Sequence, residues 1–146
     1  MPHFAFNKSL WEYGQIIEDR VMPVANELFD CNFEKNENDI FDYLDFKDHD
    51  KKVIVEVKGR KVKSTQYDKT LVTASKITAG LQEIDQGYRV HFIFAFTDKL
   101  MKYALKEDDS FECRYTGTTY VQHYLIPIHS CEEIKDSDFV HPDNDP

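Results

Sequence analysis

Glu56 and Lys58 are the residues whose types and spacing best suit chemistry, and they end the apolar run Val53-Ile54-Val55-Glu56-Val57-Lys58. A run this rich in β-branched residues predicts a strand. Because residues two apart in a strand point to the same face, Glu56 and Lys58 should stand side by side while the valines face the other way. Charges at the end of an apolar strand are costly unless they pair or bind something. A divalent metal ion and a phosphate group are ligands that this pair could bind together.

A hairpin would bring a further carboxylate to this pair. Residues 40–46 precede a polar, turn-like stretch and are predicted to pair with the strand over 52–58. If the turn centres near His49, Asp45 lies opposite Ile54. The side chain of Asp45 then shares a face with the two charged residues of the strand.

Asp42 is the alternative to Asp45. Side chains alternate along a strand, so a turn shifted by one residue would turn Asp45 away and bring Asp42 to Glu56. Either pair of carboxylates suits magnesium, which prefers one or two carboxylates with water and phosphate oxygens as its other ligands. Without a metal the two carboxylates should repel each other, and the pKa of one should rise.

An aspartate followed by Glu-x-Lys on the next strand resembles the PD-(D/E)xK nuclease superfamily. Later landmarks follow in the order seen in small stand-alone members carried by phages and large DNA viruses, and this order covers most of the chain. One departure is Leu44, which stands where the family has a proline before the aspartate. The landmarks are Leu44-Asp45-Phe46, Glu56-Val57-Lys58-Gly59-Arg60, the stretch from Tyr67 to Lys76, Phe92 to Asp98, and His123 to Ile128.

The resemblance implies an α/β fold with a restriction-endonuclease-like core, in which helices flank a mixed central β-sheet. It implies a magnesium-dependent nuclease, with manganese able to substitute, that hydrolyses phosphodiester bonds of DNA in phage or viral replication, recombination or repair. Asp45, Glu56 and the carbonyl of Val57 would be the metal ligands. Lys58 would orient or deprotonate the water, or stabilise developing charge. Glu18 is added because Gly14-Gln15-Ile16-Ile17-Glu18 resembles a Gly-x-x-x-Glu of the family's first helix, whose glutamate reaches the metal or its water.

The charge distribution supports DNA as the partner despite a formal net charge of −9. Phosphate contacts need lysine and arginine, and residues 51–76 carry eight of them against only two acidic residues. Lys76 is expected near a helix N-terminus, which attracts phosphate, and Tyr67 could stack on a base. The predicted substrate-binding residues are Arg60, Lys61, Lys63, Tyr67 and Lys76.

The remaining elements are predicted from hydrophobic spacing and from caps. A first helix over 8–29 should be capped by Ser9 and broken or kinked at Pro23, and a second should run from a Ser75 cap to about residue 86, before Gly87. Further strands are predicted over 69–73, 90–96, 101–105 and 121–128, completing one sheet.

Length and composition indicate one domain over residues 1–146, with a loosely ordered acidic tail from about residue 136. No apolar run is long enough to span a membrane, and residues 1–10 lack a signal-peptide layout. With three cysteines and no zinc spacing, the chain is expected in the cytoplasm, of a phage- or virus-infected cell if the resemblance holds. A domain this small grips little duplex, which favours a homodimer. The alternatives are a non-catalytic DNA-binding protein and an acidic protein-interaction module on the same fold.

Overall fold

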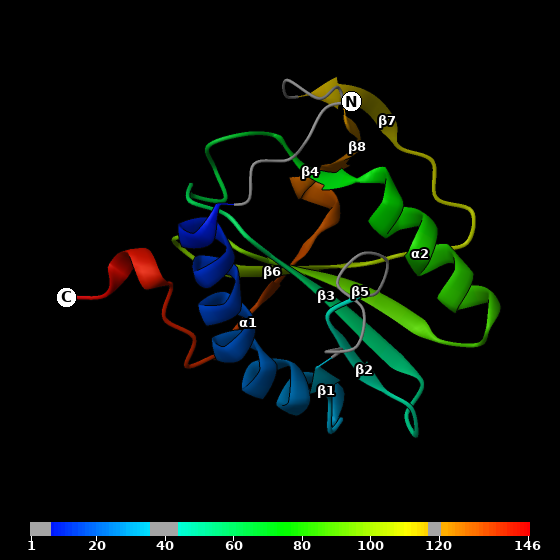
Figure 1. Cartoon of the computed structure of the whole chain (residues 1–146), viewed down its shortest axis with the longest axis horizontal. Helices are drawn as coiled ribbons and strands as arrows, with labels where there is room; N and C mark the ends of the chain where they lie inside the picture. Colours follow the sequence, from blue (N-terminus) through cyan, green and yellow to red (C-terminus); the bar gives the residue numbers. More distant parts are fainter. Residues whose placement is uncertain (1–6, 36–43, 117–120) are drawn as a thin grey trace.

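The computed structural model describes residues 7–35, 44–116 and 121–146 and has an α/β fold with a mixed sheet and two helices (Figure 1). Within these residues, no helix is both long enough and apolar enough to span a membrane. In chain order, the elements are α1 (Lys8–Phe29), β1 (Glu34–Lys35), β2 (Phe46–Asp48), β3 (Val53–Gly59), β4 (Lys69–Thr73), α2 (Ala74–Asp85), β5 (Arg89–Ala95), β6 (Leu100–Ala104), β7 (Glu112–Thr116), β8 (Val121–Pro127), η1 (Ile128–Ser130), β9 (Glu132–Ile134) and η2 (Pro142–Asn144).

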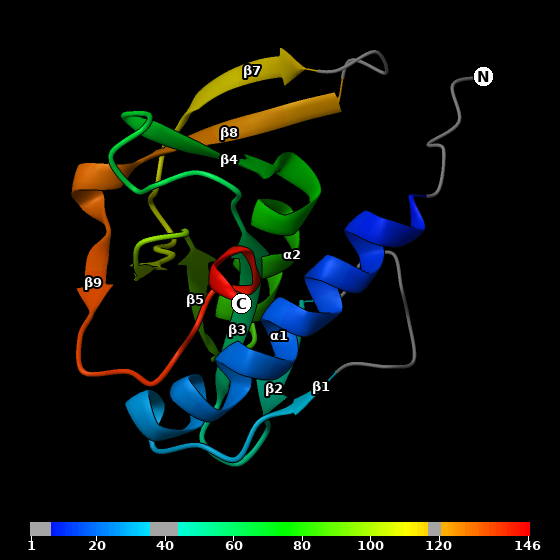
Figure 2. The ribbon, with the colours of Figure 1, turned by 90° about the vertical axis from the view of Figure 1, so that its left-hand side faces the viewer.

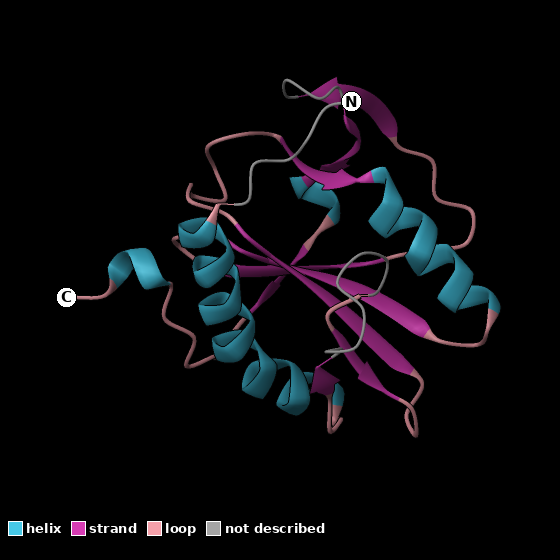
Figure 3. Ribbon diagram, viewed as in Figure 1, coloured by secondary structure: helices cyan, strands magenta, loops and turns pink. Residues whose placement is uncertain are grey.

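The strands form two sheets, not the single sheet expected from the sequence (Figure 3). The larger sheet has the order β1-β2-β3-β5-β6-β9, and only β3 and β5 in it run parallel. β4 and β8 instead pair with each other and with β7 in a smaller sheet of order β4-β8-β7. The chain therefore leaves the main sheet after β3, passes through β4 and α2, and returns at β5.

The two helices cover opposite faces of the main sheet, with α1 in front of β3 and α2 behind it in Figure 2. The valines of β3 at positions 53, 55 and 57 pack with Ile17 and Val21 of α1, whereas Ile54 packs with Ile77 of α2. The strict alternation of side chains along a strand produces this division. It places Glu56 and Lys58 on the face away from the valines, as predicted.

Gly59 allows α1 to lie close to the end of β3. A Cβ atom at Gly59 would lie 3.0 Å from Cε1 of Tyr13 and 3.1 Å from Cγ1 of Ile17. These separations are shorter than ordinary van der Waals contact, so a larger residue would push the helix away. The glycine that follows Glu-x-Lys thus brings the first turns of α1 to the charged end of the strand.

The hairpin register differs from the expected one by two residues. Lys47, not Asp45, lies opposite Ile54. The reason is the chemistry of the turn: Oδ1 of Asp48 accepts hydrogen bonds from the backbone N–H groups of Asp50 and Lys51 and so fixes where the turn closes. Because a shift of two residues keeps every side chain on its face, Asp45 still shares the face of Glu56.

The predicted N-terminal caps of both helices are wrong. Asn7 caps α1, because its side chain accepts the N–H of Leu10 and the helix already includes Ser9. The helix is not broken at Pro23, since buried residues on either side of the proline hold it against the sheet.

α2 follows β4 directly, so Thr73 occupies the cap position without a side-chain cap and Ser75 lies inside the helix. Gly87 follows the helix with φ of +93°, as its predicted role in ending α2 requires.

Candidate active site

A cleft of about 350 Å³ lies at the open end of the hairpin, where β3 extends beyond the first residue of β2. Its walls come from α1, the end of β3 and the beginning of α2. The cleft brings together all the predicted catalytic and metal-binding positions, which are Glu18, Asp45, Glu56, Val57 and Lys58. Three of the predicted substrate-binding residues also line it: Arg60, Lys61 and Lys76.

Asp45 takes the place that β2 would occupy if that strand continued. β2 begins at Phe46, opposite Val55, so the next N–H of β3 on that edge lacks a strand partner. Oδ2 of Asp45 accepts this N–H, that of Val57, at 2.8 Å, and the backbone N–H of Asp45 donates to Oε1 of Glu56 at 2.9 Å. This reciprocal pair holds the two carboxylates together. Asp42, the alternative, lies outside the described residues.

Glu56 is a buried acid held between two lysines. Its side chain is only 1% exposed, and Oε2 lies 3.0 Å from Nζ of Lys58 and 3.5 Å from Nζ of Lys76. Oε2 nevertheless accepts no hydrogen bond of normal geometry from the described residues. The two ammonium groups therefore compensate the charge of Glu56 without fully satisfying its second oxygen.

Burial dominates the acid–base behaviour of both carboxylates. Loss of hydration raises the pKa of Asp45 to about 6, and the nearby charge of Glu18 adds to the rise. Burial raises the pKa of Glu56 to about 7, although the charge of Lys58 opposes the rise. Two carboxylates that are costly to keep ionised create a demand for positive charge in the cleft.

Glu18 reaches the cleft from α1. Its Oε2 accepts a hydrogen bond from Nε2 of Gln15 at 3.0 Å, and its carboxylate interacts with that of Asp45. The helix spacing explains the position: Gly14 and Glu18 lie four residues apart on one face and both line the cleft. The sequence-based placement of Glu18 near Asp45 therefore agrees with the geometry.

The donor set of the cleft is small for a metal ion. Among the described residues, no group of three or more histidine, cysteine, aspartate or glutamate side chains is placed to hold one. Asp45 and Glu56 supply two carboxylates, and Val57 supplies a main-chain carbonyl at the same edge. Two carboxylates are enough for magnesium, which takes its other ligands from water and phosphate. The underused Oε2 of Glu56 is the atom best placed to accept a cation.

A second and larger cavity, of about 800 Å³, lies beside the cleft and shares Lys58, Arg60 and Lys61 with it. It lies between the loop after β3 and the small sheet, and the predicted substrate-binding residues other than Lys76 line it. Sequence reasoning missed its distant wall, to which β7 contributes Arg114 and β8 contributes His123. No local pattern marks those two residues, because only the pairing of β7 with β8 places them there.

Arg60 is engaged within the protein itself. Its guanidinium donates to Oγ1 of Thr70 at 3.0 Å, to the carbonyl of Gly59 at 3.0 Å and to the carbonyl of Leu71. These contacts tie the end of β3 to β4 and so hold the two cavities side by side. Lys61, Lys63 and Tyr67 are exposed, and Nζ of Lys61 lies 4.5 Å from the ring centroid of Tyr13.

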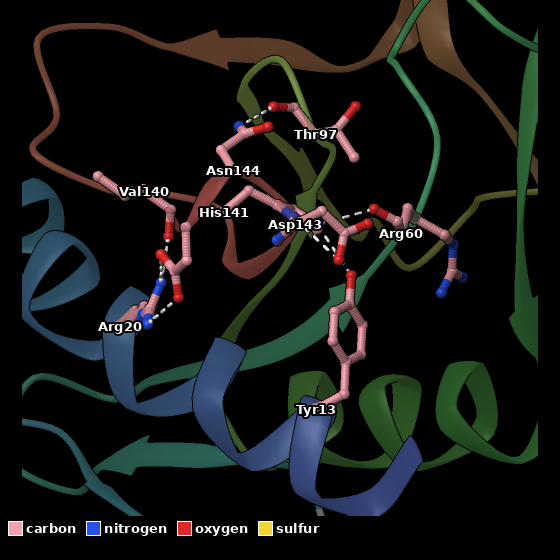
Figure 4. A network of polar contacts seen from close by, with 9 residues as sticks. Tyr13, Arg20, Arg60, Thr97, Val140, His141, Asp143 and Asn144 are labelled. Carbon is pink, nitrogen blue, oxygen red and sulfur yellow. Dashed lines mark hydrogen bonds and ion pairs between the residues drawn. The ribbon is translucent and has the colours of Figure 1, made fainter. Parts of the chain in front are cut away.

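The acidic tail, expected to be loosely ordered, is anchored against the wall of the cleft (Figure 4). His141 is 2% exposed; its Nε2 lies 2.8 Å from the hydroxyl of Tyr13 and 2.9 Å from the carbonyl of Arg60. Arg20 of α1 binds both carboxylate oxygens of Asp145 at 3.0 and 2.8 Å. The polar composition of the tail gives no sign of this anchor, because the anchor depends on partners near the start of the chain.

Tyr13 is the wall residue that sequence reasoning overlooked. It lines the cleft, contacts Gly59 and bonds to the tail. Burial raises the pKa of its hydroxyl to about 12, and Asp143 adds to the rise, so the phenol stays neutral. The sequence offered one signal that Tyr13 lies at the site: it directly precedes Gly14 of the Gly-x-x-x-Glu pattern.

Comparison of the chain with protein-family models, with curated proteins and with solved structures finds no match in any of the three.

Proposed function

We propose that this protein is a metal-dependent deoxyribonuclease with a restriction-endonuclease-like core, which hydrolyses phosphodiester bonds of DNA. The observation that carries the proposal is the placement of two carboxylates with raised pKa values, the buried Glu56 and the half-buried Asp45, beside Lys58 and Lys76 in one cleft. Such strongly shifted groups cluster at functional sites.

Each charged residue of the cleft has a separate role in the proposed hydrolysis. Asp45 and Glu56 would hold magnesium, which supplies charge neutralisation on the phosphate and an activated water when bound. Lys58, with its side chain 26% exposed, faces both the carboxylates and the opening, so it can meet a phosphate oxygen and stabilise developing charge. Lys76 adds a second positive charge at the same oxygen of Glu56. Glu18 would position the water through its contact with Asp45.

DNA suits the surroundings of the cleft. The larger cavity beside it carries a cationic rim that includes Lys61 and Lys63, whereas the net charge of the whole chain is −9. A basic region at the candidate site would direct a polyanion there, and the acidic remainder of the chain would keep affinity modest and sensitive to salt.

The test is cleavage of supercoiled and of branched DNA by the purified protein in magnesium, in manganese and in EDTA. We expect nicking or linearisation with either metal and none in EDTA. A protein that is folded by circular dichroism, binds DNA and leaves both substrates intact in both metals would contradict the proposal.

One observation favours the second candidate, a non-catalytic DNA-binding protein. Two ammonium groups already lie against Glu56, and within the described ranges no trio of metal-binding side chains is assembled. On that alternative, DNA affinity would be the same in EDTA as in magnesium, and titrated magnesium would not raise the free energy of unfolding.

A further inference from the structure

The larger cavity has the dimensions and position of a subsite for a part of the substrate. Its volume of about 800 Å³ falls in the range of pockets that enclose small organic ligands. It opens directly beside the cleft, because Lys58, Arg60 and Lys61 belong to the walls of both. A strand whose phosphate enters the cleft would therefore carry its neighbouring nucleotide to this cavity.

The walls of the cavity combine an apolar floor with a cationic rim. β4 and β8 pair with Leu71 opposite Leu125, and the floor is completed by Val62, Phe96 and Ile128. Lys63 and Arg114 are exposed at the rim, where the single acidic lining residue is Asp68. An apolar floor suits the face of a nucleobase, and the cations suit its phosphates.

Tyr67 is the exposed aromatic residue that lines the cavity. Its side chain is 64% exposed, and within the described part of the chain it makes no hydrogen bond or ring contact. A large aromatic ring in water beside an apolar floor is a platform on which a base can stack.

We propose that this cavity binds one unpaired nucleobase of the strand being cleaved, so the preferred substrate is DNA with an unpaired nucleotide beside the scissile phosphate. This inference rests on the proposed nuclease function. A base in intact duplex has both faces covered by its neighbours and cannot enter a pocket unless it leaves the stack. An unpaired base at a bulge, flap or junction enters without that cost.

The experiment measures binding and cleavage separately. Three duplexes of one sequence are compared: fully paired, with one unpaired 2-aminopurine, and with an unpaired abasic site at that position. Binding is followed in EDTA by 2-aminopurine fluorescence and by competition. Single-turnover cleavage is then followed in magnesium at saturating protein.

We expect the DNA with the unpaired base to bind about 10-fold or more tightly than the paired and the abasic DNA, since stacking of one base contributes on this scale. Tyr67→Ala should remove most of this preference and Tyr67→Phe should retain it. Tyr115→Ala, which removes a tyrosine of 63% exposure on β7, is the matched control and should change nothing.

Two outcomes separate the inference from the function on which it rests. Cleavage in magnesium with equal rates and affinities for the base-containing and abasic DNA would overturn the base pocket alone. Selective binding of the unpaired base without cleavage would overturn the nuclease chemistry and leave the pocket standing. Loss of binding in Tyr67→Ala that is matched by Tyr115→Ala would also count against the pocket.

Discussion

The β2–β3 hairpin carries one buried acid at each end, and the two are held in opposite ways. Asp48, 7% exposed at the closed end, accepts the backbone N–H groups of Asn32, Asp50 and Lys51. The bond from Asn32 leads the contacts that lower its pKa. Glu56, 1% exposed at the open end, accepts one backbone N–H, from Asp45, and its pKa rises to about 7.

The difference distinguishes a structural acid from one available to a ligand. Backbone donors at fixed positions stabilise the charge of Asp48 permanently and make it part of the turn. Glu56 is compensated chiefly by the long side chains of Lys58 and Lys76, which can move, and its Oε2 lacks a hydrogen bond within the described residues. Burial alone would not separate the two acids; the identity of their donors does.

Glu56→Gln should have the largest effect. We expect single-turnover DNA cleavage in magnesium to fall by about a thousandfold or more, because a neutral amide of the same shape does not hold a cation. Glu107→Gln, at an exposed position, is the charge-matched control and should cleave normally. Full activity of a folded Glu56→Gln protein would mean that the open end of the hairpin is no more reactive than the closed end.

Lys58→Ala should reduce turnover by about a hundredfold at saturating DNA, since it removes one positioned charge from beside the buried carboxylate of Glu56. Lys61→Ala and Lys63→Ala should weaken binding and reduce its salt dependence by about one phosphate contact each, with little effect on saturated cleavage. Single-turnover rates and binding titrations at two salt concentrations separate the two patterns. Normal cleavage by Lys58→Ala at saturation would place Lys58 among the binding residues.

The pH dependence of stability should differ between the wild type and Glu56→Gln. Because the pKa of Glu56 is raised from 4.5 to about 7, the folded protein retains a proton that the unfolded chain releases in this window. The free energy of unfolding should therefore fall as pH rises from about 4.5 to 7, by about 1–3 kcal/mol, and stay low above it.

Glu56→Gln should flatten this decline, leaving the smaller contribution of Asp45. Urea unfolding in EDTA at half-unit steps of pH provides the measurement. Identical pH profiles for the wild type and Glu56→Gln would show that the pKa of Glu56 is not raised by folding, and would remove the contrast with Asp48.

Asp48→Asn should have the smallest effect and act on stability alone. The amide oxygen can still accept from Asp50 and Lys51, but the charged oxygen that binds the N–H of Asn32 is lost. We expect a lower urea midpoint than in Asp50→Asn, an exposed neighbour, with saturated cleavage unchanged in both. A loss of cleavage without a loss of stability would break the distinction between the two ends.

The sequence predicted the shared face of the candidate residues better than it predicted the register of the hairpin that carries them. Asp45, Glu56 and Lys58 follow from the two-residue period of a strand, which survives a register shift of two. The shift itself depends on the bonds of Asp48 to the turn, and local composition does not weigh these bonds against other turns.

Features that depend on distant partners could not be predicted. β9 is three residues long and only one of them is buried, so its sequence shows almost no strand pattern. β7 pairs only within the small sheet. The separation of β4 and β8 from the main sheet has no local pattern at all. The same holds for Arg114, which reaches the larger cavity through the pairing of β7 with β8.

The anchored tail has a consequence for synthesis. His141 follows Tyr13 by 128 positions, so Tyr13 leaves the ribosome long before its partner exists. A nascent chain would already contain every charged residue of the cleft while the wall formed by α1 still lacked its tie to the carbonyl of Arg60. Completion of that wall would therefore wait until residue 141 has been synthesised, and shorter nascent chains would have a looser cleft than chains that include His141.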